Sequence, residues 1–390
     1  MGVESLHVLG REGKFFATVE TVYGTRVKHT ATDAVKMLNV SFDFQHERIP
    51  RMDTRNTRSL LERIAMRKSV KWSAEGYLIP SGSAGTPPDI HPLLLRVFSG
   101  YVNTGSTSDV YSLANSQTAL ESLTLSWGDY AELYSQAIAG AIVDRLTINT
   151  SESQEPRLKW EGMGANMYHT GTSTLNGAMS GSTTMVVQTV DGDNFEAGSL
   201  VKVDNTVGTN GLQVTVDSAR PSFTVDASVT ESDASTVVPY LPSETTAGSP
   251  LAGTAGSLNI AVTGGPGAAN IPITEFECTI ANNVNMIQEA LTEYPTDYTL
   301  PYREVTGSFT FRARKDLIIY LANRKHNRDA DVAVTIGNAA GRRLVIDLPK
   351  IVFDLAPLEI PSELEAIVRM PFVALSSALA NEDEVKWSFT

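Results

Sequence analysis

The chain of 390 residues is 42% hydrophobic and 19% charged, a composition typical of a folded protein with one large domain or two or three smaller ones. Its formal net charge of −13 argues against a general nucleic-acid binder, since affinity for phosphates comes from Lys and Arg. The single cysteine, Cys278, excludes an internal disulfide and a multi-cysteine zinc site. No apolar run reaches the roughly 20 residues of a membrane helix, so we expect no membrane insertion.

The first concentrated feature along the chain is the basic stretch ERIPRMDTRNTRSLLERIAMRKSVK, residues 47–71. Arg51, Arg55 and Arg58 fall on one stripe if this segment is helical. One interpretation is a solvated charged face. The other is an arginine-rich surface, including Arg48, that contacts an acidic surface on another copy of the chain, because the planar guanidinium group pairs with carboxylates in bidentate fashion.

Regular elements follow in this first zone, residues 1–165. SVKWSAEGYLIP, residues 69–80, alternates like a strand. PPDIHPLLLRVFSG, residues 87–100, has the leading prolines and the trailing glycine of a short helix. The stretches 119–127 and 139–150 predict a hairpin, and 157–165 predicts a further strand.

The middle zone, residues 166–275, is rich in small and β-branched residues and nearly free of Lys and Arg. Short β-branched runs separated by Gly, Asn, Asp or Pro predict a small all-β module at about 170–245. The Gly/Ala/Ser/Thr-rich stretch 242–270 predicts a linker or long loop that encloses one strand at 257–263. We therefore expect a module inserted into a discontinuous domain formed by residues 1–165 and 276–390.

The last zone repeats the order of elements seen in the first. Residues 303–313 predict a strand, 315–325 a helix, and 342–354 with 366–377 a hairpin-like pair. The chain thus contains two strand–helix–strand–strand units, separated by the middle zone.

The strand LVIDLPKIVFD, residues 344–354, changes its alternation at Pro349. Because proline cannot donate to a strand ladder, Pro349 marks an edge or a bulge where the pairing changes partner. In an assembly of copies, the partner of such an edge is the neighbouring chain. Asp347 and Asp354 would then face either a channel or the arginines of a neighbour.

No catalytic, cofactor-binding or metal-binding motif is recognised in the sequence. The nucleophile-elbow, phosphate-loop and zinc-protease patterns are missing, and the six histidines include no pair at i, i+4. The sequence does not support an enzyme, and we expect no cofactor and no metal.

Taken together, the outer zones resemble the major tail tube proteins of long-tailed bacteriophages. The resemblance covers residues 20–165 and 276–380, and it is carried by a series of loose patterns. These are TVYGTR, the arginine-rich stretch, EGYLIPSG with its proline-led helix, LTINTSESQEPRLKWEGMGA, ANNVN, YREVTGSFTFRA, LPKIVFDLAPLEIP and RMPFVALSS. The middle zone resembles the extra domains that some tube proteins carry outside the tail.

The resemblance implies a mainly β fold with few helices, a tail-tube-like sandwich or barrel with a flanking helix, and an inserted all-β domain. It implies that six copies close into a ring with an inner barrel, or three copies if two tube-like halves are fused. Rings would stack through long loops into a channel through which DNA passes without specific binding. The implied partners are further copies, the tape measure protein and the tail terminator and baseplate proteins, in a virion tail assembled in the bacterial cytoplasm.

Two other functions remain open at the level of sequence. One is another structural role in the phage, in the tail, neck, baseplate or as a decoration protein. The other is a protein that binds carbohydrate or the host surface through the 170–245 module.

Overall fold

The structure is a computed structural model that describes residues 12–53, 59, 62–113, 121–152, 154–204, 206–208, 210–263, 269–313, 328–354, 358–359, 366–378 and 381–390. These residues form an 18-stranded sheet, a six-stranded sheet and a two-stranded sheet, all with antiparallel pairs. The prediction of a mainly β fold with few helices is confirmed.

The elements before the module are β1 (Gly13–Val19), the 3-10 turn η3 (Ala31–Asp33), β2 (Asn39–Pro50), β3 (Arg63–Tyr77), α1 (His91–Phe98), β4 (Ser99–Asn103), β5 (Asp109–Leu113), β6 (Leu123–Asp129), β7 (Ser135–Ser151), β8 (Gln154–Gly164) and β9 (Asn166–Thr170). The predicted strands at 69–80 and 157–165 are β3 and β8, and the predicted hairpin is β6 with β7. The strands β1, β2, β4, β5 and β9 were not predicted from the sequence.

The elements after the module are β16 (Gly256–Val262), β17 (Ala269–Asn270), β18 (Glu275–Ala281), β19 (Asn285–Ile287), β20 (Asp297–Thr299), β21 (Glu304–Arg312), β22 (Ala330–Ala339), β23 (Arg342–Phe353), β24 (Leu358–Glu359), β25 (Ile367–Ala374) and β26 (Lys386–Phe389). The predicted hairpin-like pair is confirmed, because residues 351–353 of β23 pair with 372–374 of β25. The predicted helix at 315–325 lies outside the described residues.

Two series of strands in the large sheet pair in the same order. The first runs β1–β6–β7–β8–β3–β2, and the second runs β16–β22–β23–β25–β21–β18. The pairing of β7 with β18 joins the two series into one sheet. The order of strand pairing is therefore repeated. The correspondence differs from the expected one, because β23 and β25 occupy the places of β7 and β8 and not those of the predicted hairpin β6–β7.

One hydrophobic core serves both series. The row of directly opposed residues Val40, Ala74, Trp160, Leu146, Ile280, Val305 and Ala374 crosses the sheet on its inner face. Six of its members are at most 5% exposed, and Val40 packs against them. Truncating a fully buried aromatic such as Trp160 to alanine would cost about 3–5 kcal/mol, so this row holds the sheet on its core.

The predicted short helix is confirmed as α1, which packs against β7. A proline lies in its first turn, and Ser99 caps its end in the left-handed conformation at φ 61°. It ends two residues before the expected boundary, because Ser99 and Gly100 already pair with β5.

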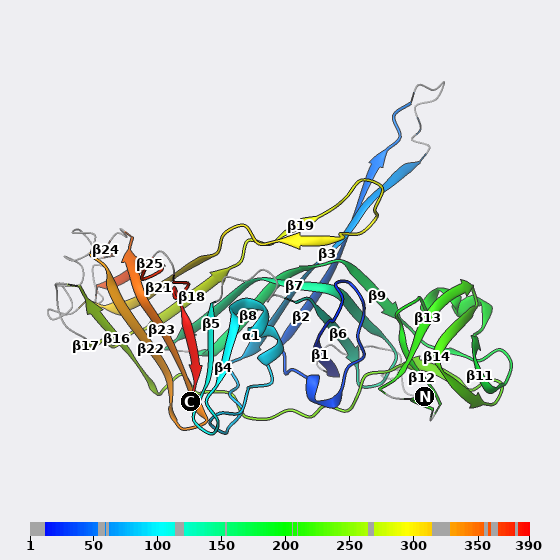
Figure 1. Cartoon of the computed structure of the whole chain (residues 1–390), viewed down its shortest axis with the longest axis horizontal. Helices are drawn as coiled ribbons and strands as arrows, with labels where there is room; N and C mark the ends of the chain where they lie inside the picture. The colour runs from blue at the N-terminus through cyan, green and yellow to red at the C-terminus, as the bar shows by residue number, and fades with distance from the viewer. Residues whose placement is uncertain are drawn as a thin grey trace.

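The six-stranded sheet runs from Ser173 to Pro239 and has a hydrophobic cluster of its own. Its strands are β10 (Ser173–Thr174), β11 (Met179–Val186), β12 (Leu200–Val203), β13 (Leu212–Ala219), β14 (Ser222–Glu231) and β15 (Thr236–Pro239), with the 3-10 turn η5 (Thr189–Asn194). It forms the green lobe at one end of the molecule (Figure 1). We call residues 173–239 the module; the division of the chain into domains stays a prediction.

Residues 240–255 connect the module to β16 and run along the lower side of the body in Figure 1. We call this segment the strap. The Thr245 amide donates to the Ala31 carbonyl at 2.9 Å, and the Leu251 amide donates to the Leu78 carbonyl at 3.0 Å. Leu251 is only 5% exposed. Of the two predicted forms, a linker or a long loop, the strap has the second, because it is irregular and is bonded to and packed on the body.

Candidate assembly surfaces

The most prominent surface feature is the hairpin of β2 and β3, whose outer part projects from the body as an arm (Figure 1). We define the arm as residues 46–53 and 62–68. Its pairing runs through Arg48 with Ala65 to Pro50 with Arg63, after a register shift beyond His46. The helical stripe expected around Arg51 is wrong, because Arg51 directly follows β2 and bonds back to Glu62. Arg55 and Arg58 lie outside the described residues.

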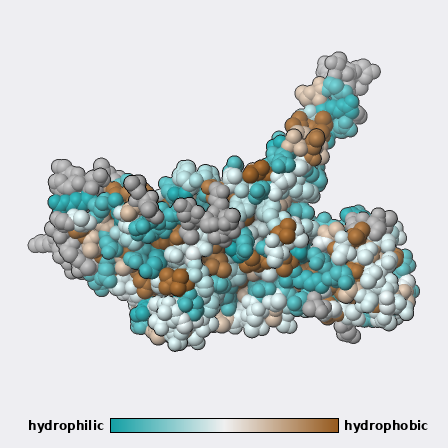
Figure 2. Space-filling model, viewed as in Figure 1, coloured by the Kyte–Doolittle hydropathy of each residue, from teal (hydrophilic) through white to brown (hydrophobic). Residues whose placement is uncertain are grey.

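The arm exposes large apolar side chains, and Figure 2 shows them gathered along it. Ile49 and Ile64, which oppose each other, are 43% and 49% exposed, and Met52 is 83% exposed. Several exposed apolar residues on one projection mark an interaction surface rather than ordinary scatter. Sequence reasoning found the charges of this segment but overlooked its apolar side chains.

The arginines of the arm differ in how firmly they are held. Arg51 pairs with Glu62 at 2.8 Å and with Asp53 at 3.1 Å, and these carboxylates raise the pKa of its guanidinium. Arg48 is exposed and contacts His46 at 3.3 Å. Arg51 therefore meets acids of its own hairpin, while Arg48 contacts no acid among the described ion pairs.

A second projection, residues 282–303 with β19 and β20, lies beside the arm (Figure 1). Lys68 bonds to it twice: its amide donates to the Glu293 carbonyl at 2.8 Å, and its ammonium pairs with the Glu293 carboxylate at 2.5 Å. That carboxylate raises the pKa of Lys68. The tip residue Leu291 is fully exposed and has a φ of 71°. The two projections thus support one another.

The outer face of the large sheet is polar and open. A second row of directly opposed residues, one position from the buried row, consists of Asn39, Glu75, Lys159, Thr147, Thr279, Thr306 and Val373. Directly opposed residues share a face, so this row lies on the side away from the core. We call it the polar face. Some of its charges are paired: Arg157 of β8 pairs with Glu75 of β3 at 3.1 Å, and Lys159 pairs with Glu161 along β8 at 2.6 Å.

Strand β23 carries the bulge predicted at Pro349. Val332 pairs with Leu348 and Ala330 with Ile351, so two residues, Pro349 and Lys350, oppose one. The partner on the other side also changes there, from β26 at 344–347 to β25 at 351–353. The expectation of a bare edge is wrong for residues 344–347, because β22 and β26 occupy both sides.

The structure does not bring Asp347 and Asp354 together. Asp347 lies before the bulge, opposite Lys386 at 4.0 Å. Burial, together with the charge of Asp347, raises the pKa of Asp331. Asp354 lies after the bulge and is exposed, and its amide donates to the Pro371 carbonyl at 2.9 Å.

A buried carboxylate holds the turn that follows β1. Glu20 is 2% exposed, and its two oxygens accept bonds from Ser122 Oγ at 2.5 Å, from Thr124 Oγ1 at 2.8 Å and from the amide of Gly24 at 3.0 Å. The amide of Gly140, in a bulge of β7, reaches both oxygens at 2.9 and 3.1 Å. Every donor around this carboxylate is thereby satisfied.

Two residues of the following segment, Arg26 and Lys28, fasten the module to the body. Arg26 is 5% exposed, donates to the Gly198 carbonyl at 2.6 Å and lies over the Tyr168 ring; burial lowers its pKa to about 10. Lys28 pairs with Asp226 at 2.5 Å and donates to the Gly211 carbonyl at 2.6 Å. Sequence reasoning missed these contacts, because the partners lie more than 170 residues away.

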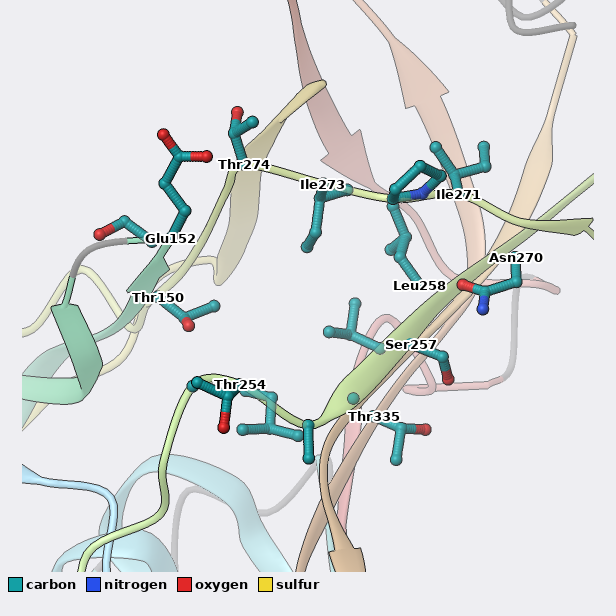
Figure 3. A pocket seen from close by; sticks show the side chains of 17 residues that line it. Thr150, Glu152, Thr254, Ser257, Leu258, Asn270, Ile271, Ile273, Thr274 and Thr335 are labelled. Atoms are coloured by element: carbon teal, nitrogen blue, oxygen red, sulfur yellow. The ribbon is translucent and has the colours of Figure 1, made fainter. Parts of the chain in front are cut away.

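A hollow of about 300 Å³ lies between the end of β7, the start of β18 and β16 (Figure 3). Its walls are small polar and aliphatic side chains, such as Thr150, Ser257 and Ile271, and its one ionisable residue is Glu152. Glu152 pairs with Arg312 at 3.4 Å. In the described residues no group of His, Cys, Asp or Glu is arranged to hold a metal ion, and the hollow offers no nucleophile–base pair.

Comparison with known proteins gives little. No protein-family model matches the chain, and no curated protein matches it. A solved structure, a chain of the anti-feeding prophage baseplate determined by cryo-EM with 6-fold symmetry, matches 36% of this chain and 95% of its own length, with 10% identity and a TM-score of 0.28. A likeness of this size carries no argument about fold or function. In the described part of the chain, no helix has the length and apolar character to span a membrane.

Proposed function

We propose that the chain is a structural protein of a bacteriophage tail, and specifically the tail tube subunit that forms stacked rings around a channel for DNA. One observation carries the proposal: a continuous antiparallel sheet, β2–β3–β8–β7–β18–β21–β25, covers the core with one face and leaves a polar face open. In the described residues no strand pairs with the outer edge of β2. A bare edge is a template for another chain, and closing sheets into a barrel removes it.

The polar face suits the wall of such a channel. Several of its cations are engaged by carboxylates: Arg157 pairs with Glu75, Lys159 with Glu161 and Arg312 with Glu152, whereas Lys71 and Arg369 make no ion pair among those described. Affinity for nucleic acid requires cations free to neutralise phosphates. A wall with several of its charges paired would let DNA pass without specific binding, which also fits the net charge of −13.

The arm suits contacts between stacked rings. It combines exposed apolar side chains with Arg48, and the sequence places Arg55 and Arg58 in the same segment. A heterologous interface that closes on itself produces rings, and obligate interfaces of this kind bury about 2,000 Å² or more. A projecting arm adds to the area that two stacked rings bury between them. Six copies per ring, or three because each copy carries two strand series, would complete the barrel.

The remaining parts of the proposal follow from the tube role. The module would sit outside the channel, and the tape measure, terminator and baseplate proteins would be partners in the virion tail, assembled in the bacterial cytoplasm. The chain would be neither an enzyme nor cofactor-dependent. Sugar binding through residues 170–245 stays a prediction: Phe195 and Phe223 are both fully buried and cannot stack on a sugar, whereas Tyr240 is partly exposed.

Negative-stain electron microscopy of the purified protein tests the proposal. We expect rings or tubes with a central channel; particles that remain monomeric at high concentration would contradict it. The variant Ile49→Asp with Ile64→Asp should fold, because both side chains are about half exposed, but should not form tubes. Val216→Asp is the matched control: Val216 is 50% exposed on the module, and this variant should form tubes normally.

A further inference from the structure

The two strand series are equivalent in register as well as in order. In the first, Leu125 pairs with Ile138 and Leu123 with Ala141, so Ala139 and Gly140 form a bulge in β7. In the second, Val332 pairs with Leu348 and Ala330 with Ile351, so Pro349 and Lys350 form a bulge in β23. Both bulges have two residues opposite one and occupy the same place. The two series are therefore structural repeats.

Packing around two glycines supports the same alignment. Trp72 of β3 is opposite Gly162 of β8, and a Cβ on Gly162 would lie 2.6 Å from the Trp72 ring. Gly307 of β21 is opposite Phe372 of β25, and a Cβ on Gly307 would lie 2.5 Å from the Phe372 ring. In each repeat one aromatic ring covers a glycine on the neighbouring strand, with the roles of the two strands exchanged.

The joint between the repeats lies just after the first bulge. Beyond Gly140, β7 pairs with β8 on one side and with β18 on the other, from Arg145 opposite Ala281 to Ser151 opposite Glu275. The equivalents of β7 are β23 and β24, and the equivalent of β18 is β2. Both β24 and β2 are open where the joint would form: in the described residues β24 pairs only with β25, and β2 only with β3.

We propose that β2 of one copy pairs antiparallel with β24, and with the end of β23, of the next copy, repeating between chains the joint that β7 and β18 form within the chain. The proposal rests on the proposed tube, whose ring it would close. The pairing partner is a second copy of this chain. Each copy has both edges, unpaired in the residues described, and the equivalent edges, β7 and β18, already pair within the chain. The bare edge expected near Pro349 thus lies after the bulge rather than before it.

The register of the joint follows from the repeats. Ile280 pairs with Val305 as Phe44 pairs with Val70, so Glu277 is equivalent to Ser41. Ile148 pairs with Leu158 as Leu358 pairs with Val368, so Asn149 is equivalent to Glu359. Since Glu277 is opposite Asn149, Ser41 of one copy should be opposite Glu359 of the next.

Disulfide trapping tests this register. Directly opposed residues of antiparallel strands have Cα atoms about 4.5–5.5 Å apart, within the range of a disulfide. Ser41→Cys with Glu359→Cys, oxidised with copper phenanthroline at high concentration, should give covalent oligomers on a non-reducing gel. An equal mixture of the two single variants should stop at covalent dimers.

Two further variants are controls. Thr147→Cys with Thr279→Cys sits in the intrachain joint, where the two hydroxyl oxygens are 3.0 Å apart, and should form a disulfide within the monomer. Ser41→Cys with Lys386→Cys, a pair of exposed sites that the proposal keeps apart, should stay reduced.

Each outcome decides. Tubes that form while the Ser41–Glu359 pair stays reduced and the intrachain control oxidises would overturn the joint and leave the tube role standing. A Ser41–Glu359 disulfide within one chain would overturn it as well. Neither tubes nor covalent oligomers would contradict both proposals.

Discussion

The carboxylate of Glu20 offers a direct test of how the first repeat is held. It is the acceptor for the amides of Gly24 and Gly140 and for two hydroxyl groups, in a site that is 2% exposed. Glu20→Gln keeps the shape of the side chain but replaces one acceptor oxygen with an NH₂ donor. The hydroxyl groups of Ser122 and Thr124 can rotate to accept a hydrogen bond from this NH₂ group, whereas a backbone amide can only donate.

The expected loss has two parts. At least one buried amide, that of Gly24 or Gly140, would face the new donor and lose its partner, at a cost of about 1–3 kcal/mol. The remaining bonds would change from charge-assisted to neutral, which lowers each by about 1 kcal/mol. With three donor groups still bonded, the two parts together predict a free energy of unfolding reduced by about 4–6 kcal/mol.

Urea unfolding followed by tryptophan fluorescence measures this loss, since the midpoint shift multiplied by the slope gives the change in free energy. Glu304→Gln is the matched control, because Glu304 is exposed on the polar face, and it should change stability by less than 0.5 kcal/mol, roughly the value for a surface site. A Glu20→Gln protein within about 1 kcal/mol of the wild type would refute the reasoning that this carboxylate holds the bulge.

Three further predictions concern buried or bridging groups. Lys28→Met removes the ion pair with Asp226 and the bond to the Gly211 carbonyl. We expect the contact between module and body to weaken by about 1 kcal/mol, which would make limited proteolysis between them roughly fivefold faster. An unchanged proteolysis rate would contradict the anchoring role of Lys28. His29 is fully buried, and burial lowers its pKa to about 3, so below its ordinary value of about 6.5 the unfolded state binds a proton that the folded state does not. Stability should therefore fall by roughly 1.4 kcal/mol per pH unit on going down from pH 6.5; urea midpoints at pH 7 and pH 5 measure this, and His29→Gln should show a smaller slope. Burial raises the pKa of the Cys278 thiol to about 12, so iodoacetamide should label it in urea and not in the native protein; rapid native labelling would contradict its burial.

Much of the fold could be predicted where local pattern and tertiary role agree. The alternation around Trp72 predicted β3, because the same residues face the core. The prolines before α1 and the glycine after it marked the helix, since both act through the backbone alone. The phase change at Pro349 predicted the bulge, because a proline inside a ladder leaves few other solutions.

Other features depend on partners that are distant in the sequence. Arg51 lies beside a hairpin and not on a helix, because long-range pairing of β2 with β3 outweighs local propensity. The contacts of Arg26 and Lys28 are made to carbonyl groups of Gly198 and Gly211, and a carbonyl acceptor leaves no sequence signature. The strand β22 was overlooked although Ala330, Val332, Val334 and Ile336 alternate along it.

Because of the strap, insertions and deletions have different consequences within the module and in the segment that follows it. Residues added or lost in turns between the module strands alter only the module's own outline. A residue lost from the strap would instead draw β16 along its partner β22 by one position and turn its buried face, including Leu258 and Ile260, toward solvent, because side chains alternate along a strand. In this architecture the module can change in length or be replaced, whereas the strap must keep its number of residues.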